Sequence, residues 1–73
     1  MRLRLYGTEF CHLCEQAEEL LKTIGIADEY IDIADDDALI ESYGTRIPVL
    51  RRDDNGAELG WPFDTAAVER FIR

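Results

Sequence analysis

The sequence has few basic residues and no long apolar run, and each shortage excludes a class of function. Eight lysine and arginine residues face sixteen aspartate and glutamate residues, so the formal charge is -8. This excess of negative charge repels nucleic acid and anionic membrane surfaces, and neither is expected as a partner. No apolar stretch reaches membrane-spanning length, and residues 1–7 are too short and too charged for a signal peptide. We therefore expect a cytoplasmic protein.

Cysteine is also scarce, since Cys11 and Cys14 are the two that the sequence contains. One short loop closed by one disulfide braces a secreted mini-protein only weakly. A closed zinc site needs four ligands, and with His12 as the sole histidine a carboxylate would have to complete it within one chain. Haem attachment requires histidine after the second cysteine, where this chain has Glu15. The pair is interpreted as catalytic, and an iron–sulfur cluster shared between two chains remains the metal-binding alternative.

The sequence shows no linker, internal repeat or low-complexity tract. Its 73 residues have room for one small core, and we expect a single domain over residues 1–73 that is a monomer. Hydrophobic residues make up 47% of the chain, which favours a globular fold over disorder although 33% of residues are charged.

The first half of the chain alternates between strand and helix patterns. Apolar and polar residues alternate over residues 2–6, which predicts a strand that Gly7 and Thr8 end. Apolar residues recur at helical spacing over residues 13–24 and predict a helix, for which Gly25 supplies a left-handed cap.

A second strand and a second helix follow. The apolar run over residues 30–33 predicts the strand. Asp35 is expected to cap a short helix through Leu39 and Ile40, because its carboxylate can accept hydrogen bonds from the unpaired amides at a helix start. Gly44 is expected to end this helix.

The last third of the chain predicts a hairpin and a helix. Strands are expected over residues 47–50 and 57–59, and the Asn55-Gly56 pair between them is typical of a tight hairpin turn. Asp64 is expected to cap the last helix, with Phe63 packing on Val68.

The predicted order is β-α-β-α-β-β-α. A strand-helix-strand start makes the first half of the sheet parallel, and the hairpin makes the second half antiparallel. We therefore expect an α/β fold in which helices cover both faces of a four-stranded mixed sheet, giving a three-layer sandwich.

The Cys11-His12-Leu13-Cys14 segment follows a strand and opens a helix. Helical neighbours three positions apart face the same side, so the two sulfurs can reach bonding distance. Cys11 lies at the positive end of the helix dipole, which favours its thiolate, and is the expected nucleophile. Cys14 lies deeper and is expected to resolve the mixed disulfide that Cys11 forms.

Three neighbouring side chains are expected to shift the pKa of Cys11, and not all in the same direction. Glu9 and Glu15 are carboxylates close to Cys11 and raise its pKa. His12, when protonated, would stabilise the thiolate, and the alternative is that His12 is simply exposed to solvent.

Three segments resemble the glutaredoxin-like branch of the thioredoxin superfamily, including its small bacterial members. Tyr6 and the cysteine segment are similar to the opening strand and active-site turn of that family. Thr45-Arg46-Ile47-Pro48-Val49 is similar to its Thr-Val-Pro segment, and Gly60-Trp61-Pro62-Phe63-Asp64-Thr65 to its glycine-rich turn and acidic cap. The resemblance spans nearly the whole chain. It implies a thioredoxin-like fold of the glutaredoxin type and a dithiol enzyme that reduces protein disulfides or glutathione mixed disulfides.

The resemblance also implies roles for residues outside the cysteine segment. In this family the proline is cis and faces the cysteines, and the residue before it pairs with the bound peptide or glutathione. From the residues alone, a proline that starts a strand can be cis or trans, and an aromatic residue such as Trp61 can complete the core or flank the groove. The expected substrate-binding residues are Phe10, His12, Ile47, Pro48, Gly60, Trp61 and Asp64.

The electron donor is expected to be glutathione or a thioredoxin reductase, with no bound cofactor or metal. Many glutaredoxins have a lysine that contacts glutathione three residues before the first cysteine, and this chain has Thr8 there. The glycine and acid motifs are reduced to Gly60 and Asp64, a pattern closer to glutaredoxin-shaped proteins that thioredoxin reductase reduces. The competing interpretations are a metal-binding or iron–sulfur-binding adaptor and a redox sensor whose cysteines are oxidised without turnover.

Overall fold

The structure is a computed structural model that describes residues 2–73; Met1, which the predicted domain includes, lies outside the described residues. Strands and helices alternate through the first half of the chain, and a hairpin and a helix follow. The elements are β1 (Leu3–Gly7), α1 (His12–Thr23), β2 (Glu29–Asp32), the 3-10 helix η1 (Ile33–Asp35), α2 (Asp37–Tyr43), β3 (Val49–Arg52), β4 (Glu58–Gly60) and α3 (Thr65–Phe71).

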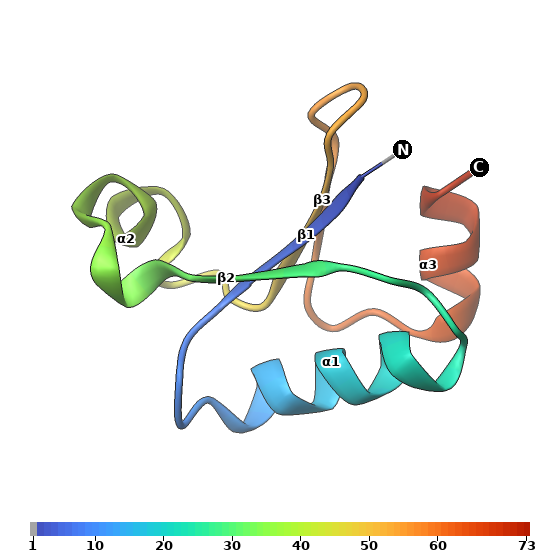
Figure 1. The fold of residues 1–73 in the computed structure, drawn as a ribbon, viewed down its shortest axis with the longest axis horizontal. Coiled ribbons are helices and arrows are strands. Elements are labelled where there is room, and N and C mark those ends of the chain that lie inside the picture. Colours follow the sequence, from blue (N-terminus) through green and yellow to red (C-terminus); the bar gives the residue numbers. More distant parts are fainter. Residues whose placement is uncertain (1) are drawn as a thin grey trace.

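The four strands form one mixed sheet in the order β2-β1-β3-β4. β1 and β2 are parallel, whereas β3 runs antiparallel to both β1 and β4. Figure 1 shows α1 and α3 close together along one side of the molecule and α2 at its far end. Within the described chain, no helix is long and apolar enough to span a membrane.

The larger core lies between the sheet and the pair α1 and α3. Leu5 and Leu50 are partners in neighbouring strands, and both are fully buried. They pack with Leu21 of α1 and Val68 of α3, which are also fully buried. Removing a leucine side chain from water stabilises the fold by about 1.5–3 kcal/mol, so these contacts hold the two helices against the sheet.

The second face of the sheet carries a smaller cluster around two tyrosines. Side chains alternate along a strand, so Tyr6 faces away from Leu5 and packs with Val49, Ile33 and Tyr43. The rings of Tyr6 and Tyr43 stack with centroids 4.4 Å apart. This cluster fixes η1 and α2 to the second face, and the predicted three-layer α/β fold is confirmed.

The Tyr43 hydroxyl ties α2 to β4. It donates a hydrogen bond to the Glu58 carboxylate at 2.5 Å. Burial and this carboxylate raise the pKa of Tyr43, so the hydroxyl stays protonated and remains a donor.

The second strand ends one residue earlier than the apolar run predicts. Ile33 belongs to η1, because the Asp32 carboxylate accepts the backbone N–H of Ala34 at 2.9 Å and turns the chain. Ile33 is nevertheless buried in the tyrosine cluster, which explains why its apolar character resembled a strand residue.

The cap of α2 is Asp36 and not Asp35, so this prediction is wrong by one residue. The Asp36 carboxylate accepts the backbone N–H groups of Ala38 at 2.9 Å and Leu39 at 3.3 Å. Three consecutive aspartates cannot be distinguished by residue type, and the cap is chosen by where η1 ends.

The third strand begins at Val49, two residues later than predicted. The Ile47 backbone N–H donates to the Tyr43 carbonyl at 3.1 Å, so Ile47 continues the turn after α2 and cannot join the sheet. The Ile47–Pro48 peptide bond is cis, and Pro48 is fully buried.

The predicted hairpin is confirmed, with a wider turn than a two-residue loop. The Arg52 backbone N–H donates to the Ala57 carbonyl at 2.9 Å, which closes a loop over residues 53–56. Gly56 has a φ of 71°, a conformation that glycine adopts without the cost that a side chain adds. β4 accordingly spans Glu58–Gly60, one residue later than predicted.

Three predicted helix ends are confirmed. Gly25 has a φ of 75° just after the Ile24 cap of α1, as expected for a left-handed cap. Gly44 is the C-terminal cap of α2. Asp64 caps α3, where its carboxylate accepts the backbone N–H of Ala67 at 2.8 Å.

Candidate functional site

The two cysteines lie at the start of α1, directly after β1. Cys11 is the N-cap residue, and its sulfur accepts the backbone N–H of Cys14 at 3.2 Å. The two residues form a disulfide, with their Cα atoms 5.2 Å apart. The predicted approach of the two sulfurs is confirmed.

The two cysteines differ strongly in their access to solvent. Cys14 is 1% exposed and packs inside the fold, whereas Cys11 is half-buried. A sulfur at a helix start is also favoured as a thiolate by the unpaired backbone N–H groups and the helix dipole. Cys11 is therefore the more accessible of the two cysteines.

Gly7 and Tyr30 form the wall behind the buried cysteine. A Cβ atom added to Gly7 would lie 2.5 Å from the Tyr30 hydroxyl oxygen and 3.0 Å from the Cys14 sulfur. The Tyr30 hydroxyl donates to the Thr8 carbonyl at 3.1 Å, which fixes the loop between β1 and Cys11. Burial, followed by the negative charge of Glu18, raises the pKa of Tyr30, so this donor keeps its proton.

Sequence reasoning did not find Tyr30 as a site residue. It lies 22 positions from Thr8, and nothing in the local pattern distinguishes it from an ordinary strand residue. The parallel pairing of Leu5 with Tyr30 brings it beside the cysteines, and that pairing is set by the whole sheet.

His12 lies on the surface beside Cys11. Its side chain is 83% exposed, and its Nδ1 atom is 3.9 Å from a carboxylate oxygen of Glu15, which is itself exposed. The structure therefore agrees with the solvent-exposed alternative for His12.

Phe10 presents a bare aromatic ring next to Cys11. Its side chain is 98% exposed and its backbone has a φ of 59°, which is uncommon for a residue other than glycine. Leu13, on the first turn of α1, is 45% exposed. An exposed apolar pair therefore adjoins the accessible sulfur.

The proline loop lies at the same edge of the sheet as the cysteines. Tyr6 near the end of β1 pairs with Val49 at the start of β3, so Pro48 enters the sheet where β1 leaves it. The Pro48 carbonyl accepts the backbone N–H of Trp61 at 3.1 Å and joins this loop to the end of β4. Ile47 is half-buried against the tyrosine cluster.

The segment after β4 has a structural role. Trp61 packs on the larger core and meets Phe63 edge to face, with ring centroids 5.0 Å apart, which agrees with the core alternative for Trp61. The Trp61–Pro62 peptide bond is also cis, which the sequence analysis did not anticipate. Gly60 pairs with Val49 at the sheet edge.

Asp64 is not brought together with the cysteines. It caps α3, and Figure 1 shows the start of α3 toward the end of α1 and away from the start of α1, where the cysteines lie. The substrate-binding roles of Gly60, Trp61 and Asp64 stay predictions.

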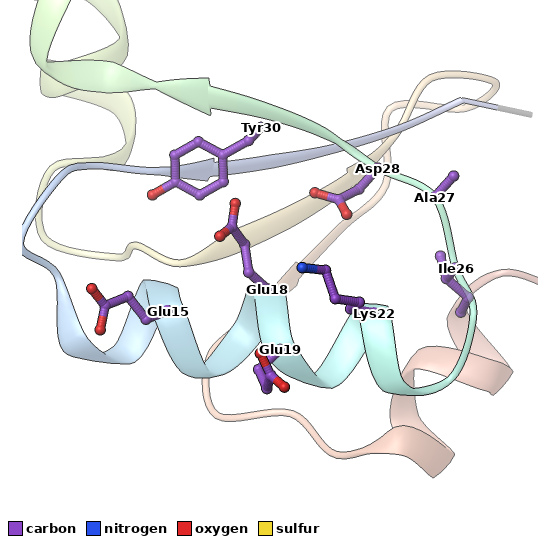
Figure 2. Close-up of a pocket in the computed structure, with 8 residues that line it drawn as sticks. All are labelled: Glu15, Glu18, Glu19, Lys22, Ile26, Ala27, Asp28 and Tyr30. Atoms are coloured by element: carbon purple, nitrogen blue, oxygen red, sulfur yellow. The ribbon is translucent and has the colours of Figure 1, made fainter.

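An open groove of about 520 Å³ lies between α1 and the segment leading into β2. Figure 2 shows Glu15 and Glu18 projecting from α1 toward it, with Asp28 and Tyr30 on the opposite wall. Burial, and then the charge of Glu18, raise the pKa of Asp28. Sequence reasoning did not identify this groove, because its walls are far apart along the chain.

Among residues 2–73, no group of three or more histidine, cysteine, aspartate or glutamate side chains is placed to hold a metal ion.

Comparison with protein families gives one matching model. The model described as glutaredoxin-like domain (DUF836) matches residues 2–73. No curated protein matches the chain significantly.

Solved structures with this arrangement include three of bacterial structural-genomics proteins. The crystal structure of target protein XcR50 from X. campestris is 44% identical, with a TM-score of 0.87 over 96% of this chain and 93% of that chain. The solution structure of the same target, also 44% identical, gives a TM-score of 0.85 over 99% and 92% of the two chains. The solution structure of protein Ne2328 from Nitrosomonas europaea is 29% identical, with a TM-score of 0.81 over 96% and 88%.

Proposed function

The chain belongs to the glutaredoxin-like domain family, and on that premise we propose that it is an enzyme that reduces disulfides through Cys11 and Cys14. The observation that carries this proposal is the disulfide at the start of α1, in which one cysteine residue is half-buried and the other is fully buried. Such a pair can exchange electrons with an external disulfide in two ordered steps.

The first step belongs to Cys11. In the reduced protein its thiolate attacks one sulfur of a substrate disulfide, forms a mixed disulfide and releases the other substrate sulfur as a thiolate. The start of α1 supports this role, since unpaired backbone N–H groups and the helix dipole stabilise negative charge on Cys11. Glu9 and Glu15 act in the opposite direction and limit how far the thiolate is favoured.

The second step belongs to Cys14. Its thiolate attacks the Cys11 sulfur, releases the second substrate thiolate and leaves the Cys11–Cys14 disulfide. The substrate gains two electrons, the protein loses two, and solvent protonates the released thiolates. The Cα separation of 5.2 Å supports this closure within one turn of helix.

A thiol donor must then reduce the protein disulfide. Two glutathione molecules, which become glutathione disulfide, or the dithiol of a thioredoxin reductase can supply the two electrons. Because this chemistry requires a reducing compartment, we place the protein in the cytoplasm. Protein disulfides and glutathione mixed disulfides are the proposed substrates. Ile47, which is half-buried, is the residue proposed to face them, and the fully buried Pro48 is proposed to position it, since their loop lies at the edge of the sheet where β1 ends.

The deciding experiment compares two single substitutions with the wild type. We expect Cys11→Ser to abolish reduction of a small neutral disulfide, because no accessible thiolate remains. We expect Cys14→Ser to keep the first step and accumulate a mixed disulfide, visible as an added substrate mass on the intact protein.

Turnover that survives in Cys11→Ser would end the catalytic proposal. A wild-type pair that oxidises and reduces reversibly, yet turns over no disulfide with either donor, would indicate a redox sensor. Metal or iron–sulfur absorption that is lost in Cys14→Ser would indicate an adaptor.

A further inference from the structure

We propose that the substrates are cationic polypeptide segments, which dock their disulfide against the exposed apolar pair Phe10 and Leu13 and against the acidic surface around it. This inference rests on the proposed function, since it names the substrate class of the same disulfide. Three features of the molecule carry it: the apolar pair, the distribution of charge, and the acidic groove that starts beside the cysteines.

The apolar pair offers a contact that a polypeptide can fill and a small polar thiol cannot. Phe10 directly precedes Cys11, and this residue is 98% exposed. Leu13 follows two residues later and is 45% exposed. An aromatic ring gains free energy when a partner covers it, and exposed apolar groups beside a reactive atom are typical of contact surfaces.

The negative charge is concentrated in the chain segments that adjoin the sheet edge where the cysteines lie, including α2. We define the cysteine end as residues 7–15 and 32–48, which surround the edge of the sheet where β1 and β2 end and β3 begins. This end holds seven carboxylates and one arginine, Arg46, so the rest of the chain is nearly balanced, with nine carboxylates and seven cations. The carboxylates are Glu9, Glu15, Asp32, Asp35, Asp36, Asp37 and Glu41.

Arg46 does not offset this charge at the cysteines. Its guanidinium contacts the Glu58 carboxylate at 3.5 Å and donates to the Ser42 carbonyl at 3.0 Å. It also lies over the Tyr43 ring, 5.0 Å from the centroid. Arg46 is thus held by its own neighbours, and the surplus of carboxylates at the cysteine end is the basis for the negative field that we infer in front of Cys11.

The acidic surface continues into the groove along α1. Glu15 belongs both to the first turn of α1 and to the groove, and Figure 2 shows Glu18 and Asp28 further along it. Lys22 is the one cation among the residues that line it. Burial and the charge of Glu18 raise the pKa of Asp28, so a lysine or arginine of a bound segment would stabilise carboxylates that now repel one another.

The same field disfavours glutathione disulfide. That disulfide is a small anion, and like charges raise the free energy of its approach to Cys11. A cationic segment is attracted over the whole cysteine end and then covers Phe10. The negative charge thus favours cationic polypeptide disulfides over the anionic glutathione disulfide, although the thiol chemistry is the same for both.

The test measures how fast the reduced protein reduces two synthetic peptides. Each peptide has one internal disulfide and a leucine beside it, flanked by lysines in one peptide and by glutamates in the other. Protein and peptide exchange two electrons, so the protein becomes a disulfide and the peptide a dithiol. At about 10 mM ionic strength we expect the lysine peptide to react at least tenfold faster, and the ratio to approach one near 0.5 M NaCl.

Two double variants with equal charge locate the effect. Glu9→Gln with Glu15→Gln removes two carboxylates at the cysteine end and should lower the lysine-to-glutamate rate ratio by about threefold. Asp53→Asn with Glu69→Gln removes two exposed carboxylates outside both the cysteine end and the groove, and should leave the ratio within about 1.5-fold of the wild type. The ratio is the readout because a change in thiolate reactivity alters both rates alike.

A neutral small disulfide separates failure of this inference from failure of the proposed function. If the protein reduces the neutral disulfide but reduces both peptides at the same rate, the proposed substrate class is wrong, whereas the proposed disulfide reductase activity is supported. If it reduces none of the three, the proposed function fails as well. Equal effects of the two double variants on the ratio would overturn the role of the cysteine end.

Discussion

At the scale of single residues, the packing behind the cysteines depends on Gly7. Its φ lies outside the left-handed region, so its backbone conformation is open to any residue. Glycine is needed here because a Cβ atom would lie too close to the Tyr30 hydroxyl oxygen and the Cys14 sulfur. Both neighbours are held, Tyr30 by Thr8 and Cys14 by the helix.

We predict that Gly7→Ala destabilises the protein by about 1–3 kcal/mol, as overpacking of a filled site does. The measurement is urea unfolding of the oxidised protein. Tyr30→Phe removes the hydroxyl that lies 2.5 Å from the added Cβ, so the double variant should recover part of the loss.

Gly60→Ala is the matched control for this prediction. A Cβ at Gly60 has no neighbour within 4 Å, and the change should alter the free energy of unfolding by less than about 0.5 kcal/mol. Equal effects at Gly7 and Gly60 would show that packing against Cys14 is not the cause.

The sequence predicts those site residues whose role is local. Cys11 and Cys14 interact through helical spacing, and Asp64 caps the helix that follows it. The place of Tyr30 beside the cysteines does not follow from the sequence, because it depends on a strand pairing. Phe10 is among the expected substrate-binding residues, but its positive φ depends on the loop and is not predicted.

At the scale of elements, the groove between α1 and β2 contains a carboxylate in an unfavourable place. Asp28 is half-buried in the wall of the groove, and burial and Glu18 raise its pKa above 3.8. The folded state therefore binds a proton at Asp28 more tightly than the unfolded chain does. The stability that this group contributes is greatest below pH 3.8 and is lost as the pH rises through its raised pKa.

We predict that Asp28→Asn stabilises the protein at pH 7 and that the gain disappears near pH 3, where Asp28 of the wild type is already protonated. The free energy of unfolding in urea at the two pH values measures the difference. Asp35→Asn makes the same change in net charge at an exposed position.

A gain of equal size in Asp35→Asn would attribute the effect to net charge and not to the groove. A gain for Asp28→Asn that persists unchanged at pH 3 would contradict the role of ionisation.

Element order and helix ends could be read from the sequence, whereas several boundaries could not. Periodicity and caps predict every strand and α-helix in the right order, because each is a local property of the chain. The shifts at Ile33, Asp36 and Ile47 arise where one element runs directly into the next. There the choice between two adjacent residues depends on hydrogen bonds such as that from Ile47 to Tyr43.

At the scale of the whole molecule, negative charge opposes folding. The formal charge is -8, and the cysteine end holds seven of the sixteen carboxylates. Each of the arginine–carboxylate ion pairs has one partner more than a third exposed, and such pairs contribute about 0–1 kcal/mol each, so we expect repulsion between carboxylates to outweigh them.

We predict that raising NaCl from about 10 mM to about 0.3 M increases the Tm of the oxidised protein by about 3–8 °C, because salt screens this repulsion. Calorimetry or circular dichroism measures the shift. The Glu9→Gln with Glu15→Gln variant should respond less to salt than the Asp53→Asn with Glu69→Gln variant. A Tm that falls with salt would mean that attractive pairs dominate.

The disulfide closes within a single helical turn, between Cα atoms 5.2 Å apart. That separation is close to the spacing of residues three positions apart in a helix, although Cys11 itself is the extended N-cap residue, and we therefore expect the backbone to stay in place when the bond is broken. The oxidised and reduced proteins would then have the same backbone conformation and the same surface shape. A partner must distinguish them by the sulfur chemistry it meets and not by a change of shape, and either form can occupy the same docking position.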